Sequence, residues 1–292
     1  MNNKNVHRIL IPVDFSPAAK CAIDYGAFLA NGFRADVLLL HAVEGINRYP
    51  RDWFDGDTSG GGKEFIQSKV TEKLGDIAES ITKKYGIYVQ SLLTTGRPSS
   101  KIAEAVVERD IDLIVMGAHG LSGFEEFFMG STAHKVVNMS PCPVITVPEN
   151  FNSAEIKTVV LPIDDTKHSR QKVSNAIPIA AKCNSVVHIL GLMHSSDKSD
   201  IAKFNIKINT VEEAAKKAGL KYITKVIKAG NIAMETMKYA QDVKADMLAI
   251  MTDHESNMTG MFMGAFARQI VNHSNVPVLS IKPIIGPYES SA

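Results

Sequence analysis

Two glycine segments separated by nine residues are the part of the sequence best suited to chemistry. An apolar run at residues 113–116 leads into Gly-Ala-His-Gly at 117–120, and Gly-Ser-Thr follows at 130–132. Glycine has no Cβ, so its backbone N–H groups can approach an anion closely. A helix opening at 130–132 would add free N–H groups and two hydroxyls. The spacing predicts a phosphate cradle, meaning residues 117–120 and 130–132; the alternative is glycine turns and a helix capped by Ser131.

The cradle lacks other features of common nucleotide-cleaving sites. It matches neither GxGxxG nor the Walker A pattern, because no GK[ST] is present. Asp14, which follows the first apolar run, either hydrogen-bonds a ligand or accepts from its own loop amides. Phosphoryl transfer needs further groups that hold a metal and orient the nucleophile, and no clear second acid stands beside Asp14. We therefore expect a binding module, with a slow ATPase or nucleotidyl transferase, or a scaffold without ligand, as the alternatives.

Other polar residues near the cradle have simpler interpretations. His119 is expected to be a partly exposed loop residue, with a proton donor as the alternative, and His41 a packed or solvated histidine beside a strand end rather than a metal ligand. Arg97 either reaches phosphates from a neighbouring loop or is solvated. Asp253 and His254 could form a metal pair, but no further ligand spacing supports one. We therefore predict no metal site made by protein ligands and assign no catalytic residue.

Alternating apolar strands and amphipathic helices must hold these residues in place. A good helix N-cap, Ser16, precedes Pro17, and further helices are expected across 65–85, from Ser99 or Ser100, and within 127–138. Uniformly apolar strands between helices imply a parallel sheet covered on both faces. Ligands of such sheets bind beyond the carboxyl ends of the strands. The predicted strands are HRILIPV, VLLLHAV, VQSLLTT, LIVMG and PVITV, and then VVLPI, VVHILGL, ITKVIKA, MLAIM and VPVLSI.

The strand pattern is written twice along the chain. RILIPVD at 8–14 matches TVVLPID at 158–164, an offset of 150, whereas Pro143 and Pro277 are offset by 134. The first copy therefore carries about fifteen extra residues, best placed at 45–63. Two domains are predicted, at 1–149 (the first half) and 155–285 (the second half). The link between them is too short for a long flexible tether.

Composition excludes several classes of protein. Lys and Arg number 32 against 31 Asp and Glu, so bulk electrostatic binding of nucleic acid is not expected. No apolar run approaches the roughly 18 residues that a membrane span needs. The N-terminus lacks the apolar region of a signal peptide. Three scattered cysteines suit buried thiols in a reducing compartment. A cytoplasmic protein is the expectation.

Several segments, taken in order, resemble the universal stress protein family. They are the strand opening Pro-Val-Asp-Phe-Ser at 12–16, LLLHAV, the turn at 96–98, DLIVMGAHGLSG with GSTAHKVV, and SPCPVITVP. Weaker counterparts follow in the same order in the second half. The chain therefore resembles a tandem universal stress protein.

The resemblance implies an α/β fold of two Rossmann-like, adenine nucleotide alpha hydrolase-like units, each a doubly wound parallel five-stranded sheet. It implies a stress-response binding and signalling role and, in one subclass, bound ATP or another adenine nucleotide, with or without Mg²⁺. Family positions lining adenosine match Pro12, Val13, Asp14 and Ala42. At position 42 the family more often has Val than Ala. Those holding ribose and phosphates match Met116, Gly117, Gly120, Gly130, Ser131 and Thr132. The family's last strands pair about a two-fold axis, so PVITV and PVLSI imply an intramolecular pseudo-dimer, and a further homodimer stays open.

The second half departs from this pattern at the cradle. With the offset of 134, Gly117 aligns with Met251, Gly120 with His254, and Ser131 with Ala265. Side chains then stand where backbone would have to meet phosphate. The resemblance thus implies an intact nucleotide motif in residues 1–149 and a degenerate one in 155–285.

Overall fold

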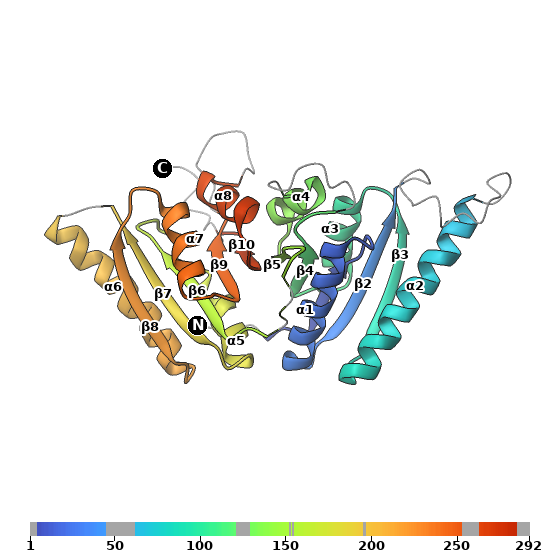
Figure 1. Cartoon of the computed structure of the whole chain (residues 1–292), viewed down its shortest axis with the longest axis horizontal. Coiled ribbons are helices and arrows are strands. Elements are labelled where there is room, and N and C mark those ends of the chain that lie inside the picture. Colours follow the sequence, from blue (N-terminus) through green and yellow to red (C-terminus); the bar gives the residue numbers. More distant parts are fainter. Residues whose placement is uncertain are drawn as a thin grey trace.

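The computed structural model describes residues 5–44, 62–120, 129–151, 153, 155–194, 197–252 and 263–284. The expected insertion at 45–63 and the pair Asp253 and His254 therefore lie almost wholly outside the described residues. Strands and helices alternate throughout, as predicted (Figure 1). The first half contains β1 (Arg8–Pro12), α1 (Pro17–Phe33), β2 (Asp36–Val43), α2 (Gly62–Tyr85), β3 (Val89–Thr95), α3 (Pro98–Glu108), β4 (Leu113–Gly117), α4 (Ser131–Met139) and β5 (Val144–Val147).

The second half repeats this order with one clear local difference. Consecutive turns with hydrogen bonds between residues three apart replace the start of the first helix. The amides of Ser169, Gln171 and Val173 donate to the carbonyls of Thr166, His168 and Arg170, respectively. The second half contains β6 (Thr158–Ile163), α5 (Val173–Lys182), β7 (Val186–Met193), α6 (Lys198–Lys217), β8 (Tyr222–Lys228), α7 (Ile232–Asp242), β9 (Met247–Met251), α8 (Ala265–His273) and β10 (Val278–Ile281).

Each half contributes five parallel strands, and the two sets join into one sheet. The order is β3-β2-β1-β4-β5-β10-β9-β6-β7-β8. Within each half the chain reverses its direction of winding between the first and fourth strands, as in Rossmann-like folds. Antiparallel pairing of β5 with β10, at the centre of Figure 1, connects the halves. Two sheets were expected from the sequence; the structure makes them one continuous sheet of ten strands.

Helices cover both faces of this sheet because successive strand residues point to opposite sides. Ile9 and Ile11 of β1 pack in the layer with α1, α2, α5 and α6. Leu10, between them, packs in the opposite layer with α3, α4, α7 and α8. A membrane span would need a longer and more apolar helix than any that the structure describes.

Helix starts decide how the loops at the carboxyl edge of the sheet are placed. Ser16 caps α1 as predicted, accepting from the amide of Ala19 at 3.1 Å, and Pro17 is the first helical residue. The helix after β3 begins at Pro98 with Arg97 as N-cap, slightly before the predicted Ser99 or Ser100. The helix after the cradle begins at Ser131, with Gly130 as N-cap.

Candidate functional site

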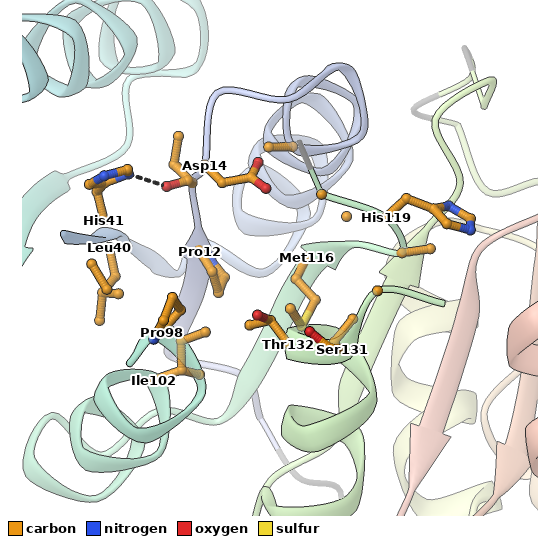
Figure 2. Close-up of a pocket in the computed structure, with 18 of the residues that line it drawn as sticks. Pro12, Asp14, Leu40, His41, Pro98, Ile102, Met116, His119, Ser131 and Thr132 are labelled. Atoms are coloured by element: carbon orange, nitrogen blue, oxygen red, sulfur yellow. Dashed lines mark hydrogen bonds between the residues drawn. The ribbon is translucent and has the colours of Figure 1, made fainter. Parts of the chain in front are cut away.

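A cavity of about 450 Å³ opens at the carboxyl ends of β1, β2 and β4 (Figure 2). All ten residues singled out by the family pattern line it. They come from the ends of three strands and the first turn of α4. They are Pro12, Val13, Asp14, Ala42, Met116, Gly117, Gly120, Gly130, Ser131 and Thr132.

Asp14 uses its two carboxylate oxygens differently. Oδ1 accepts from the Ser16 amide at 3.0 Å and from the Ser16 hydroxyl at 2.6 Å. Oδ2 faces Gly120, where an added Cβ would come within 2.8 Å of it. The two alternatives for Asp14 are thus compatible, since one oxygen closes the turn and the other faces the cradle. Phe15, between Asp14 and Ser16 in this turn, adopts a left-handed φ of 63°, which is rare for a bulky residue.

The glycines of the cradle are required for different reasons. A Cβ on Gly117 would lie 2.9 Å from the backbone of Ala18, so this glycine lets the first turn of α1 approach β4. At Gly130 an added Cβ would meet nothing closer than 3.5 Å, an ordinary contact. Protein packing therefore explains Gly117, whereas at Gly130 it leaves room beside the helix start.

The start of α4 presents to the cavity backbone N–H groups that the helix itself leaves without acceptors. The amide of Gly130 donates to the Ala118 carbonyl at 2.8 Å and so ties the two segments of the cradle together. The next amides, of Ser131, Thr132 and Ala133, have no acceptor within the helix because they belong to its first turn. Ser131 is exposed at the first helical position rather than at the N-cap, which excludes the simple capping interpretation. Aligned peptide dipoles make this end favourable for an anion.

His41 is packed inside the cavity wall rather than poised as a metal ligand. Its Nδ1 lies 2.6 Å from the carbonyl oxygen of Val13, and its ring contacts Phe15 at 5.1 Å between centroids. Burial lowers the pKa of His41, although the Val13 carbonyl and the charge of Asp14 act to raise it. A neutral ring bonded to a carbonyl must donate through Nδ1–H. His41 therefore fixes the end of β1 that carries Asp14.

The structure also adds residues that sequence reasoning missed. Pro98 and Ile102, on one face of the first turns of α3, line the cavity opposite β1, and Glu44 lines it at the end of β2. Arg97 is exposed and does not line it. The helical spacing of Pro98 and Ile102 directly after a predicted strand was the signal available. His119 contributes to the wall, but its ring points away from the cavity (Figure 2).

The corresponding region of the second half is arranged differently. Met251, aligned with Gly117, is buried at the end of β9. Asp164, aligned with Asp14, accepts from the amide of Thr166 at 2.9 Å and from its hydroxyl at 2.6 Å. Burial acts to raise the pKa of Asp164, but the charge of Lys172 and bonds from Thr166 and Ser169 outweigh it and lower that pKa. The ammonium of Lys172 is itself buried, 3.3 Å from the Ser169 hydroxyl.

Within the described residues, no group of three or more His, Cys, Asp or Glu side chains is gathered as a metal site. The three cysteines all lie in described segments and form no disulfide with one another.

Comparison with known proteins agrees with this organisation. The sequence pattern of the universal stress protein family matches residues 5–148 and again residues 155–282. The chain belongs to the universal stress protein family. It carries two copies of the family unit in tandem, and the two sequence relatives named first below each match about one copy.

Universal stress protein YxiE of Bacillus subtilis is 27% identical over 154 residues, which covers 48% of this chain and 98% of YxiE. A universal stress protein of Thermus aquaticus is 32% identical over 139 residues, covering 48% of this chain and 96% of its own. The crystal structure of a universal stress protein from Archaeoglobus fulgidus covers 94% of this chain and 98% of its own with a TM-score of 0.74. Its identity is 18%, so this likeness concerns the fold alone.

Proposed function

We propose that the first half of this universal stress protein binds ATP or another adenine nucleotide and acts as a stress-response binding and signalling module. The observation that carries the proposal is the convergence of the ten predicted residues on one cavity. Its volume of about 450 Å³ lies in the usual range for small-molecule sites, about 300–1,000 Å³. Since ATP is an intracellular ligand, the proposal keeps the cytoplasmic location expected from the sequence.

The chemistry of the cavity changes from one end to the other, as a nucleotide requires. Pro12, Leu40 and Ile102 offer apolar surface for a base, and Asp14 Oδ2 can accept from an adenosine donor group. Across the cavity, the cradle and the first turn of α4 offer N–H groups and hydroxyls for phosphates. We assign adenosine to the β1–β2 side and the phosphates to the α4 side.

Charge on the phosphates would be met mainly by dipoles. Among the described residues that line the cavity, none is Lys or Arg. Two carboxylates, of Asp14 and Glu44, line the same cavity, so Mg²⁺ arriving with the nucleotide would find protein acceptors there. Glu44 is the second acid that the sequence did not reveal, and it makes a slow ATPase the second candidate function. A single-turnover assay with ATP and Mg²⁺, comparing the unaltered protein with Glu44→Gln, separates hydrolysis from binding alone.

We propose further that the two halves are separate domains at 1–149 and 155–285, and that the second does not hold nucleotide in this way. Two observations support this: Met251 is buried, and the charge of Lys172 acts on Asp164. The antiparallel pairing of β5 with β10 supports an intramolecular pseudo-dimer, in which the second half takes the place of a second subunit. A further homodimer stays a prediction for analytical ultracentrifugation.

The test is the stoichiometry of adenine nucleotide, followed by a matched pair of variants. We expect one equivalent per chain, measured by calorimetry with ATP and by release of nucleotide from freshly purified protein. Gly130→Val places a branched side chain beside the start of α4 and should abolish binding. Gly264→Val alters the equivalent N-cap of α8 and should leave it unchanged. Two equivalent sites, or no adenine nucleotide bound at all, would overturn the proposal.

A further inference from the structure

A second cavity lies at the opposite, amino-terminal edge of the sheet, where the two halves meet. It has a volume of about 450 Å³. Its walls come from residues before β1, β4 and β5, from the end of α3, and from α5 of the second half. Residues that matter for its chemistry are Val6, Ile111, Asp112, Cys142, Asn175 and Ile179. None of them lines the candidate nucleotide site.

The internal repeat shows what occupies the equivalent place on the other side of the molecule. β1 pairs with β2 through Arg8 and Asp36, and β6 with β7 through Thr158 and Val186, an offset of 150. β1 pairs with β4 through Ile9 and Leu113, and β6 with β9 through Val159 and Met247, an offset of 134 for the later strands. Asn175 of α5 therefore corresponds to Tyr25 of α1, and Asp112 corresponds to Asp246.

The surroundings of the two aspartates confirm that these places are equivalent. Asp112 accepts from the amides of His7 and Arg8 at 2.7 and 3.0 Å. Asp246 accepts from the amides of Lys157 and Thr158, both at 2.8 Å. Each aspartate therefore makes the same pair of bonds to the start of its neighbouring strand. The local backbone is conserved between the halves, so the difference between them is in the side chains.

Tyr25 fills its place with a phenol ring. Only 1% of the residue is exposed, and its hydroxyl donates to the Asp246 carbonyl at 3.5 Å. Its ring meets Phe151 edge to face, with 5.9 Å between centroids. Asn175, in the equivalent position, ends in a short amide and lines open space. Val6, equivalent to the buried Ile156, is only partly buried.

We propose that this second cavity binds a small, neutral aromatic alcohol, with its ring in the place that Tyr25 takes in the other half and its hydroxyl toward the Asp112 carbonyl. Aliphatic walls from Val6, Ile111 and Ile179 suit an aromatic ring. Asp110 and Asp112 are among the lining residues, and their negative charge disfavours an anion. A carbonyl can accept a second hydrogen bond, so the hydroxyl need not compete with the sheet.

The experiment uses 4-methylphenol, which reproduces the tyrosine side chain, on the full chain and follows binding by ligand-detected NMR. We expect saturable binding that persists when the nucleotide site is filled with excess ATP. The methyl ether 4-methylanisole has the same ring but cannot donate a hydrogen bond, and it should bind at least several-fold more weakly.

Two variants test whether the ligand binds in this cavity. Asn175→Tyr supplies the missing ring from the protein and should abolish binding while raising the melting temperature. Val107→Trp lies on the cavity rim, at a residue 71% exposed, where folding tolerates a larger side chain; it should also abolish binding. The proposal is overturned if 4-methylphenol shows no saturable binding up to its solubility limit, if ATP displaces it, or if a folded Val107→Trp protein binds it undiminished.

Discussion

The ends of β4 and β9 occupy equivalent places in the two halves and are built differently. Gly117 ends β4, and the first turn of α1 lies against it, with Ala18 2.9 Å from where a Cβ would stand. Met251 ends β9 and is buried, and the helix of that half begins only at Val173. Met251 packs in the sheet layer that holds α1 and α5. The glycine at the strand end thus makes room for the early helix start in the first half, and the second half has neither.

The equivalent aspartates show the same division. Oδ2 of Asp14 faces the cradle, whereas Asp164 is held by Thr166 and the charge of Lys172. One aspartate is available to a ligand, and the other is used to stabilise its own domain. Substituting each in turn should therefore give opposite results.

The largest effect is expected from Asp164→Ala. It removes the acceptor of two hydrogen bonds from Thr166 and a negative charge that acts on the buried Lys172. Because hydrogen bonds to a charged group contribute about 1.5–3 kcal/mol each and Asp164 is partly exposed, we expect about 3 kcal/mol in the free energy of unfolding, measured with urea. Nucleotide affinity should not change. The double variant Asp164→Ala with Lys172→Met should recover most of the stability; if it does not, the pair is not the cause.

The same pair predicts the pH dependence of stability. The folded-state pKa of Asp164 is lowered below its ordinary 3.8, so its contribution is fully present above that value. The contribution is lost as the pH falls through the lower folded-state pKa. Asp164→Ala should therefore differ least from the unaltered protein under strongly acidic conditions, and an equal difference at all pH values would contradict this assignment.

Asp14→Ala should have the second largest effect, chiefly on binding, although it also removes the two bonds from Ser16. A hydrogen bond to a charged group contributes about 1.5–3 kcal/mol, which corresponds to roughly a tenfold to hundredfold rise in Kd for ATP. Asp14→Asn keeps an oxygen that can accept from Ser16. It therefore shows whether the loss of affinity comes from the missing charge or from a disturbed turn. An unchanged affinity in Asp14→Ala would place adenosine elsewhere.

The difference between the two halves could be predicted from the sequence only in part. The glycines of the cradle were predictable because Gly117 ends a strand and Gly130 precedes a helix start, and Asp14 because it follows the first strand. The assignment of Pro12, Val13 and Ala42 to adenosine came from the family resemblance. Glu44 was missed although Ala42 at the same end of β2 was predicted, because the sequence does not show that the charged residue just past the strand lines the cavity. Burial of Lys172 could not be foreseen either, since lysine is rarely buried without a partner.

The third comparison concerns the two reasons for glycine in the cradle. Gly117→Ala forces a Cβ against the backbone of α1, and overpacking of this kind costs about 1–3 kcal/mol in unfolding free energy. Gly130→Ala, where a Cβ has ordinary contacts, is the matched control and should change stability little. Urea unfolding of both variants without nucleotide measures the difference. Equal stability would show that α1 moves freely away from β4.

The smallest effect tests whether the second half supports the site in the first. The amide of Met129, directly before Gly130, donates across the halves to Oδ1 of Asn272 at 3.4 Å. The equivalent Asn138 contacts His134 through Nδ2, and its own Oδ1 is buried with no hydrogen-bond partner among the described residues. A neutral hydrogen bond contributes about 0.5–1.5 kcal/mol, so Asn272→Ala should raise the Kd for ATP roughly twofold to tenfold. Asn138→Ala should leave that Kd unchanged. If both variants bind ATP equally well, the second half does not position the cradle, and its contribution ends at the β5–β10 pairing.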